Sequence, residues 1–364
     1  MNNIDFKKLG DYVKIKTGKL DANASSEDGE YPFFTCSIEP LKISSYSYDC
    51  ECCLVAGNGD LNVKYYNGKF DAYQRTYIIE SLDKEKLDVM YLYFFLSSYI
   101  EVLRKQSIGG VIKYIKLGNL TDALIPIPEL SKQKEICQNL IKAKKILSSN
   151  ENLLSKYDTL IKSRFIEMFG DPVINEKKWD LMTLPELGEF GRGVSKHRPR
   201  NASELLGGKY PLIQTGDVAS ANLYITKYNS TYSEEGFKQS KMWKAGTLCI
   251  TIAATIAKTA ILTFDSCFPD SVVGFTPNEK TNSLFINYWF SFFQKILEEQ
   301  APAVAQKNIN LQVLSELKII KPPISLQNDF AAFVQQIDKS KFAVQKSLEK
   351  AETLYKSLMQ EYFG

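Results

Sequence analysis

Two long stretches of the chain carry apolar side chains at alternating steps of four and three residues. The first runs from Ser131 to Phe169 without proline or glycine, and the second runs from Ser325 to Phe363. This 3.5-residue period predicts two long helices, each with an apolar seam of the coiled-coil kind. The seam positions are Ile136, Leu140, Ala143, Leu147, Leu154, Tyr157 and Ile161 in the first stretch, and Phe330, Val334, Ile337, Val344, Leu348, Ala351, Tyr355 and Leu358 in the second.

The flanking residues predict where the first helix begins and ends. Pro128 stops a helix upstream, Ser131 is a suitable N-cap, and Gly170 ends the stretch. A single helix cannot bury its seam, so we expect the two to pair antiparallel. About 39 residues at ~1.5 Å each make a rod of roughly 58 Å, and the polar seam residues Asn150 and Lys341 can fix its register. The alternative is that each helix packs only on its own domain.

The two helical stretches are copies of one another at a constant offset of 194 residues. The offset relates Thr159-Leu160 to Thr353-Leu354, Gln133 to Gln327, and Phe169-Gly170 to Phe363-Gly364. The segments before the helices match only faintly: Leu9-Gly10 resembles Leu187-Gly188 at an offset of 178, and Tyr31-Pro32 resembles Tyr210-Pro211 at 179. The second front half therefore holds about sixteen extra residues. This pattern predicts an internal pseudo-twofold repeat in which the unlike halves carry specificity.

Each front half mixes short strand-like runs with one helical stretch. The predicted strands include 53–56, 76–79 and a strand ending at 125–128, with 247–252, 272–275 and 318–321 in the second half; the predicted helices are 87–105 and 285–299. We therefore expect an α+β fold with two globular domains separated by two long helices that form an antiparallel coiled coil. The expected boundaries are 1–130 for the first domain, 131–170 for the first helix, 171–324 for the second domain and 325–364 for the second helix.

Composition places the chain among two-domain globular proteins. It has 364 residues, of which 44% are hydrophobic and 24% are charged. The longest apolar run falls far short of a membrane span. Seven unevenly spaced cysteines are typical of reduced thiols, which predicts a cytoplasmic protein. Cys50, Cys52 and Cys53 cluster, but no second pair at matching spacing completes a zinc site, so we interpret them as strand or buried residues.

The net charge of +3 says little about a binding partner, whereas local clusters of positively charged side chains suggest one. A loop between glycine and proline residues holds several positive side chains, and a second cluster mixes lysines with tyrosines at a turn. Such loops can hold phosphates and reach base edges, although many are ordinary solvated loops. The expected DNA-binding residues are Lys64, Lys69 and Arg75 in the first domain, and Arg192, Lys196, His197, Arg198 and Arg200 in the second.

Motifs for catalysis are missing from the sequence. There is no Walker-type phosphate loop and no dinucleotide fingerprint, and His197 has no obvious serine or cysteine partner. One alternative is a stand-alone Mg-dependent site-specific endonuclease, in which Asp270, Glu316 and Lys318 would converge on a metal ion. A helical interaction scaffold without DNA contact is a further alternative. The sequence favours binding over catalysis.

The stretch that opens each predicted helix carries a family resemblance. Ile125-Pro126-Ile127-Pro128-Glu129-Leu130-Ser131-Lys132-Gln133-Lys134 returns as Ile319-Ile320-Lys321-Pro322-Pro323-Ile324-Ser325-Leu326-Gln327-Asn328. With a variable half before each copy, the whole chain resembles the specificity (S) subunit of type I restriction-modification enzymes. It departs from the commoner pattern at Lys134 and Asn328, where an acidic residue often stands beside the glutamine.

The resemblance implies a function and a set of partners. In this family, two target-recognition domains each read one half of a split site on double-stranded DNA, and the helices act as a ruler between them. Two modification subunits dock on this scaffold and bring S-adenosylmethionine, and two restriction subunits add ATP- and Mg-dependent cleavage. The specificity subunit itself is not a catalyst, so we expect no catalytic residue, cofactor or metal in this chain, and no membrane contact.

Overall fold

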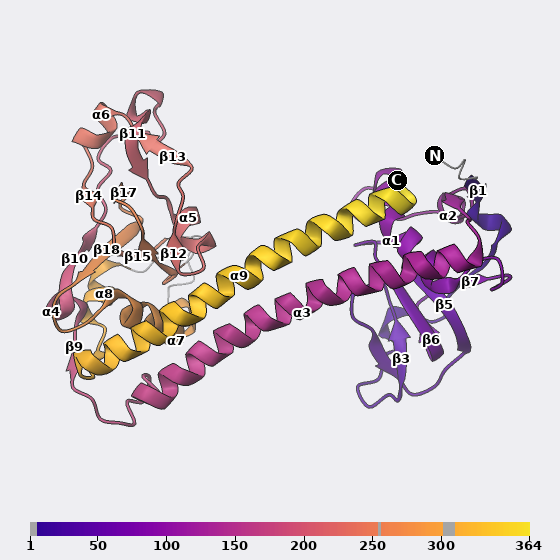
Figure 1. The fold of residues 1–364 in the computed structure, drawn as a ribbon, viewed down its shortest axis with the longest axis horizontal. Coiled ribbons are helices and arrows are strands. Elements are labelled where there is room, and N and C mark those ends of the chain that lie inside the picture. The colour runs from indigo at the N-terminus through magenta and orange to yellow at the C-terminus, as the bar shows by residue number, and fades with distance from the viewer. Residues whose placement is uncertain (1–5, 254–255, 301–309) are drawn as a thin grey trace. The chain divides into compact units, whose positions relative to one another are not determined.

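The computed structural model describes residues 6–253, 256–300 and 310–364. The chain divides into unit 1, which comprises residues 1–152 and 345–364, and unit 2, which comprises residues 153–344. Each unit contains one mixed α+β domain and parts of two helices of 40 residues, α3 (Leu130–Phe169) and α9 (Ile324–Phe363) (Figure 1). The predicted fold class and the two long helices are confirmed.

The helices begin one residue earlier than the sequence predicted. The backbone N–H groups of Lys132 and Gln133 donate to the Glu129 carbonyl oxygen, at 2.9 and 3.0 Å, so Glu129 stands at the N-cap position and the predicted Ser131 cap is wrong. The physical reason is that Ser131 already lies in the first helical turn, where its own backbone is helical. The predicted end is confirmed, since α3 stops at Phe169 and Gly170 has φ +76°.

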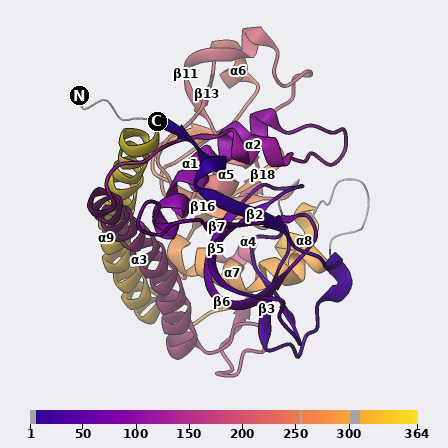
Figure 2. The same ribbon diagram turned by 90° about the vertical axis from the view of Figure 1, so that its right-hand side faces the viewer.

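Unit 1 contains a six-stranded sheet, and Figure 2 faces this part of the chain. Neighbouring strands are antiparallel except β3 and β6, which are parallel. In spatial order the strands are β2 (Val13–Thr17), β7 (Thr76–Ser81), β5 (Tyr48–Ala56), β6 (Val63–Ala72), β3 (Tyr31–Phe34) and β4 (Leu41–Ile43). Around it lie β1 (Phe6–Lys8), which pairs with β8 (Leu124–Pro126), and the helices η1 (Leu9–Asp11), η2 (Ala22–Ala24), α1 (Val89–Gln106) and α2 (Leu117–Thr121).

The side chains of β5 alternate between the two faces of that sheet. Cys53 and Val55 join the core with α1, whereas Cys52 and Leu54 pack on the opposite face with Phe70. This is the two-residue period of a strand buried on both sides. It confirms the interpretation of Cys50, Cys52 and Cys53 as strand residues, and Cys52 and Cys53 are fully buried.

The strands of unit 2 form two sheets and a separate two-stranded pair. Its main sheet runs β10 (Gly188–Arg192), β18 (Val272–Pro277), β15 (Leu248–Thr251), β16 (Thr259–Leu262) and β12 (Tyr224–Ile225). The first four strands have the order of β2, β7, β5 and β6 in unit 1, and β12 is parallel to β16. The second sheet runs β13 (Ser230–Tyr232), β11 (Leu206–Leu212), β17 (Ser266–Cys267) and β14 (Met242–Trp243). The remaining elements are β9 (Leu181–Met182), paired with β19 (Ile319–Ile320), and α4 (Leu184–Leu187), η3 (Ser203–Leu205), α5 (Thr215–Ser220), α6 (Glu234–Lys238), α7 (Ser283–Gln300) and α8 (Leu311–Glu316). In the second sheet β11 is parallel to β17 as β3 is to β6, and β11 contains the Tyr210-Pro211 pair that matches Tyr31-Pro32 of β3, so the sheet has a partial counterpart in unit 1.

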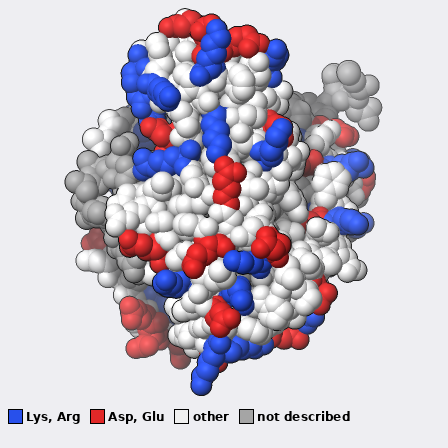
Figure 3. All heavy atoms as spheres, turned by 90° about the vertical axis from the view of Figure 1, so that its left-hand side faces the viewer, with Lys and Arg blue, Asp and Glu red and all other residues white. Residues whose placement is uncertain are grey.

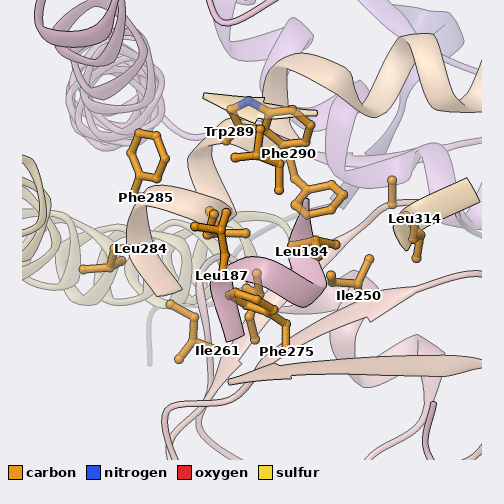
Figure 4. Packing of buried hydrophobic residues seen from close by; sticks show 14 of the residues in the cluster. Leu184, Leu187, Ile250, Ile261, Phe275, Leu284, Phe285, Trp289, Phe290 and Leu314 are labelled. Carbon is orange, nitrogen blue, oxygen red and sulfur yellow. The ribbon is translucent and has the colours of Figure 1, made fainter. Parts of the chain in front are cut away.

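The core of unit 2 lies between α7 and the main sheet. Phe285 and Trp289 of α7 belong to the same buried cluster as Ile250 and Phe275 of the strands (Figure 4). Leu184 and Leu187 of α4 and Leu314 of α8 close the same cluster. The aromatic residues of α7 are thus core residues.

Each core is completed by the ends of both long helices. In unit 2, Phe169 at the end of α3 lies 4.9 Å from Phe285 and 5.5 Å from Phe330 of α9, measured between ring centroids. In unit 1, Phe363 at the end of α9 lies 5.2 Å from Tyr91. These contacts correspond, because Phe363 and Phe285 follow Phe169 and Tyr91 by the same 194 residues. The helix ends therefore pack on globular domains as well as beside each other.

A buried glutamine ties the start of each helix to its domain. The Gln133 amide nitrogen donates to the carbonyl oxygens of Pro128 and Lys86, at 2.8 and 2.7 Å, and its oxygen accepts from the Asp88 N–H at 2.9 Å. Gln327 donates to the equivalent carbonyls of Pro322 and Lys280, at 2.9 and 3.1 Å, and accepts from Thr281 Oγ1 at 2.8 Å. Both side chains are fully buried. We call this pair of contacts the glutamine clamp.

The glutamine clamp predicts a measurable loss of stability. Gln133→Ala leaves the Asp88 N–H and two carbonyl oxygens without their partner in a buried place, so the free energy of unfolding of unit 1 should fall by about 2 kcal/mol or more. Gln138→Ala, at an exposed position on the same helix, is the matched control and should change it by less than about 0.5 kcal/mol. Urea unfolding of the full chain measures both; equal midpoints for the two variants would contradict the clamp.

Candidate nucleic-acid interface

The basic loop of unit 2, residues 193–202, leaves the end of β10 and is anchored at several points. The Gly193 N–H donates to the Val272 carbonyl oxygen at 2.9 Å, and Ser240 Oγ donates to the Val194 carbonyl oxygen at 2.8 Å. Gln239 Oε1 accepts from two consecutive N–H groups, those of Lys196 at 2.5 Å and of His197 at 2.9 Å. These bonds fix the backbone of the loop before any ligand is present.

Two arginines of this loop share one carboxylate. Arg198 donates to Asp270 Oδ2 at 3.4 Å, and Arg200 donates to Asp270 Oδ1. The other terminal nitrogen of Arg198 donates to the carbonyl oxygens of Ser195 and His197, at 2.6 and 2.8 Å. Both arginine side chains keep about half of their surface exposed, 55% and 44%. They are oriented by the protein and still accessible.

The other expected cations of unit 2 lie in or beside the same loop. Lys196 is exposed, and Arg192 is exposed at the end of β10, opposite Val273. His197 Nε2 lies 3.7 Å from Glu204 Oε1. The structure thus brings all five expected residues of unit 2 together in one segment. Figure 3 shows one face of the molecule, on which both lysine or arginine and acidic side chains are scattered over a largely uncharged surface.

The three expected cations of unit 1 are not brought together. Lys64 is half-buried on β6 and donates to Asn62 Oδ1, and burial lowers its pKa. Lys69 is exposed on the same strand, 4.7 Å above the Tyr46 ring, and its contact with the Tyr46 hydroxyl raises its pKa. Arg75 is exposed in the turn before β7. Among the described residues, no hydrogen bond or ion pair joins these three.

Strand register places Gln74 and Asp270 at equivalent places in the two domains, next to Arg75 and Ser271. The Gly18 N–H donates to the Thr76 carbonyl oxygen, as the Gly193 N–H does to Val272. A Cβ on Gly18 would meet the Ala72 carbonyl oxygen at 2.1 Å, and one on Gly193 would meet that of Phe268 at 2.2 Å. In unit 1 the loop after β2 therefore packs closely against the turn before β7. In unit 2 the loop after β10 packs in the same way against the turn before β18. Arg75 lies in that turn in unit 1, and Asp270 lies in it in unit 2.

The endonuclease alternative is not supported. Asp270 contacts two guanidinium groups, and Glu316 Oε1 accepts from Gln312 Nε2 on α8 at 2.9 Å. No group of three or more histidine, cysteine or acidic residues with metal-binding geometry occurs in the part of the chain that the structure describes. Asp270 is an arginine partner, and the convergence of Asp270 and Glu316 that the endonuclease alternative requires is not supported.

Gln239 and the role of Asp270 as an arginine partner were not predicted from the sequence. Gln239 lies 42 and 43 residues from the amides that it accepts from, and Asp270 lies 70 and 72 residues from its arginines. Neither residue belongs to a charged run or a motif. Only the folded sheets bring them to the loop, so nothing in the sequence could have assigned them.

The predicted seam is the less exposed face of both helices. Ile136, Leu140, Ala143, Ile161, Phe330, Val334, Leu348 and Ala351 are buried, and Leu147, Leu154, Tyr157, Ile337, Val344, Tyr355 and Leu358 are partly buried. In unit 1, Asn139 donates to the Tyr362 hydroxyl at 3.4 Å, and Asn150 donates to Ser347 Oγ at 3.1 Å. In unit 2, Lys341 Nζ lies 2.6 Å from Asp158 Oδ1. Residues with higher numbers on α3 contact residues with lower numbers on α9, so the two helices are antiparallel in each unit.

Both polar seam residues make contacts between the helices. Asn150 and Lys341 are the residues of the seam whose side chains bond to the facing helix, as their predicted role in fixing the register requires. Asp338 lies one turn before Lys341, and its Oδ2 atom is buried without a hydrogen-bond partner. Burial raises the pKa of Asp338, Lys341 opposes that rise, and the charge of Asp158 adds to it.

Comparison with known proteins gives a consistent result. Residues 1–156 and 176–352 match the family described as the type I restriction modification DNA specificity domain. The chain is 28% identical to the Type I restriction enzyme EcoDI specificity subunit of Escherichia coli, over 99% of this chain and 88% of that one. It is 19% identical to the EcoBI specificity subunit of the same organism, over 86% and 73% of the two chains.

Solved structures show the same fold. The S subunit of a type I restriction-modification system from M. genitalium superposes with a TM-score of 0.68 at 17% identity, covering 100% of this chain and 97% of that one. A chain from a structure titled for complex assembly and conformational transition of the type I system gives 0.57 at 16% identity, covering 99% and 97%. The fold assignment therefore rests on nearly the full length of each molecule.

The chain belongs to the type I restriction-modification DNA specificity family. Proteins of this family are the DNA-recognition subunits of their systems and not the catalytic ones. Within the described residues, no helix has both the length and the apolarity that crossing a membrane requires.

The raised pKa of Asp338 predicts a pH-dependent effect on stability. Since the folded state holds this proton more tightly than the unfolded state, protonation stabilises the fold below the unfolded pKa of about 3.9, and that contribution is lost as the pH rises through the folded value. Asp338→Asn should therefore raise the unfolding temperature at pH 7 and have little effect near pH 3.5. Asp329→Asn, at an exposed position of α9, is the control. A lower unfolding temperature for Asp338→Asn at pH 7 would show that the carboxylate is stabilising.

Proposed function

We propose that this chain is the sequence-reading subunit of a type I restriction-modification complex, and that each globular domain reads one half of a bipartite site on double-stranded DNA. The observation that carries the proposal is the repeat: two unlike domains stand on one duplicated frame, with the same glutamine clamp and the same order of the first four strands in the main sheet. A duplicated frame with different loops is what reading two different half-sites requires.

The two long helices set the spacing between the half-sites in this proposal. Their paired seams make a stiff element, and each domain core is closed by residues of both helices. A domain fixed to two helices at once has little freedom to turn about either one. The distance between half-sites would then follow the length of the helices.

The same duplicated frame would present two equivalent docking surfaces. We infer that two modification subunits bind there and supply S-adenosylmethionine, and that two restriction subunits add ATP- and Mg-dependent cleavage. The titles of the relatives support partners of this kind, since they describe specificity subunits of restriction enzymes and the assembly of a type I complex. Such a complex would work in the cytoplasm, where its DNA is and where the seven free cysteines would stay reduced.

Lengthening both helices by one heptad tests the proposal. Seven residues inserted after Asn150 and seven after Lys346 lie at one level of the pair, beside the Asn150–Ser347 hydrogen bond, and keep the seam in phase. Each insertion adds about 10.5 Å at 1.5 Å per residue, which is about three base-pair steps of ~3.4 Å. We expect the spacer in the methylated sites to lengthen by about three base pairs while both half-sites stay the same.

The control is an insertion of seven residues in α3 alone. This insertion shifts the seam residues of α3 by one heptad relative to those of α9 on one side of the insertion, so methylation should be lost. Sequencing of methylated positions in a host that carries each altered system gives the result. An unchanged spacer with the double insertion, or a changed half-site, would mean that the helices do not set the spacing.

A further inference from the structure

One acidic residue contacts two arginines of the basic loop of unit 2 from the turn before β18. Asp270 is the partner of both Arg198 and Arg200, and its own side chain keeps only 32% of its surface exposed. A carboxylate at a DNA-facing site repels phosphate, so its presence there needs a physical reason. The reason follows from what it does to the two arginines.

We propose that Asp270 is a positioning residue: it holds Arg198 and Arg200 in one orientation, so that their remaining N–H groups meet the paired acceptors of a base edge in the major groove. Guanine, with O6 and N7, is the edge that an arginine fork matches. This inference rests on the proposed function and adds to it the way in which the second domain discriminates between sequences.

Enough donors remain for that contact. A guanidinium group has five N–H donors in a fixed plane. Arg198 uses three of them, on Ser195, His197 and Asp270, and Arg200 uses one, on Asp270. The remaining donors belong to side chains that are about half exposed. Each arginine can therefore keep its contact with Asp270 while it bonds to a base.

The backbone beneath the arginines is already fixed. Gln239 accepts from the N–H groups of Lys196 and His197, and Ser195 is buried. Asp270 therefore orients side chains on a loop whose backbone is held by hydrogen bonds. A side chain that is ordered before binding loses less conformational entropy when it binds, which favours the one sequence that fits its orientation.

Unit 1 has a tether at the same place in its fold. Gln74, in the turn before β7, donates to Asp21 Oδ1 in the loop after β2, at 2.8 Å. By the strand register described above, this turn is the one that holds Asp270 in unit 2. Both units therefore have a side-chain hydrogen bond between this loop and this turn, but it joins an amide to a carboxylate in unit 1 and arginines to a carboxylate in unit 2. That is expected if the tether positions a different set of reading side chains in each domain.

Asp270 should also reduce attraction to DNA of any sequence. It neutralises one of the two arginine charges, so the pair contributes less to the phosphate attraction that all sequences share. Removal of the carboxylate should therefore strengthen binding to non-matching DNA and weaken binding to matching DNA. Both effects lower the ratio of the affinity for matching DNA to the affinity for non-matching DNA.

The test is the ratio of affinities for matching and non-matching duplexes, measured with the full chain assembled with its modification subunits. Each half-site is scrambled in turn. We expect Asp270→Asn to lower the ratio about ten-fold at one half-site, and to leave the ratio at the other unchanged. Asp270→Glu should restore most of it. Asp265→Asn is the control, because Asp265 pairs with Lys244 outside the loop and the change in charge is the same.

The double variant Arg198→Lys and Arg200→Lys separates the two levels of the proposal. If it lowers the ratio at one half-site while Asp270→Asn behaves like Asp265→Asn, the loop reads DNA and the positioning role is overturned. If neither variant changes the ratio at either half-site, the assignment of the loop to DNA is overturned as well. An equal change in affinity for matching and non-matching duplexes with Asp270→Asn would show an effect of charge alone. Thermal unfolding checks that each variant is folded, and Asp270→Ser replaces Asp270→Asn if the latter is not.

Discussion

The packing of helix ends into the domain cores is the interaction on which this architecture depends. Phe169 and Phe330 close the core of unit 2, and Phe363 closes that of unit 1 against Tyr91. Phe363 lies 272 residues from Tyr91 along the chain, and yet its ring helps to keep water from that core. Because burial of aromatic surface is a large favourable contribution to folding, neither domain is complete without a helix that begins elsewhere. Domain and helix pair should therefore form together.

The glutamine clamp converts that packing into a defined direction. Apolar contacts alone tolerate small rotations, whereas three hydrogen bonds from one buried amide do not. The clamp joins the first turn of the helix to the segment just before α1 or α7, which packs on the sheet. The loops that follow the first sheet strand are carried by the same sheets. A rigid connection thus runs from the helix to the basic loop of unit 2.

The sequence predicted the parts of the fold that depend on local patterns. A 3.5-residue period and a constant offset of 194 residues are enough to find α3 and α9, since burial of a stripe is a property of each helix. A short strand-like run at 53–56 predicted the end of β5. The start of the helix was misplaced by one residue because Ser131, a good N-cap type, lies within a turn that begins at Leu130.

The details of the candidate interface depend on contacts between distant segments, and the sequence could not predict them. The run from Lys196 to Arg200 identified a basic loop, but its orientation depends on Gln239 and Asp270. Lys64 was expected at a DNA surface because it stands beside tyrosines at a turn. In the structure its side chain lies on β6 and is about half buried. Charge alone shows where cations are dense, and the sheets decide which of them reach solvent.

The most direct test removes the end of one helix and observes the distant domain. Deletion of residues 345–364 takes Phe363 and its neighbours from the core of unit 1 and leaves unit 2 whole. Hydrogen exchange of the shortened chain should then show lost protection in α1, with the protection of the β15 and β18 amides unchanged. Full protection of α1 after the deletion would contradict the claim that each domain is completed by the helix of the other repeat.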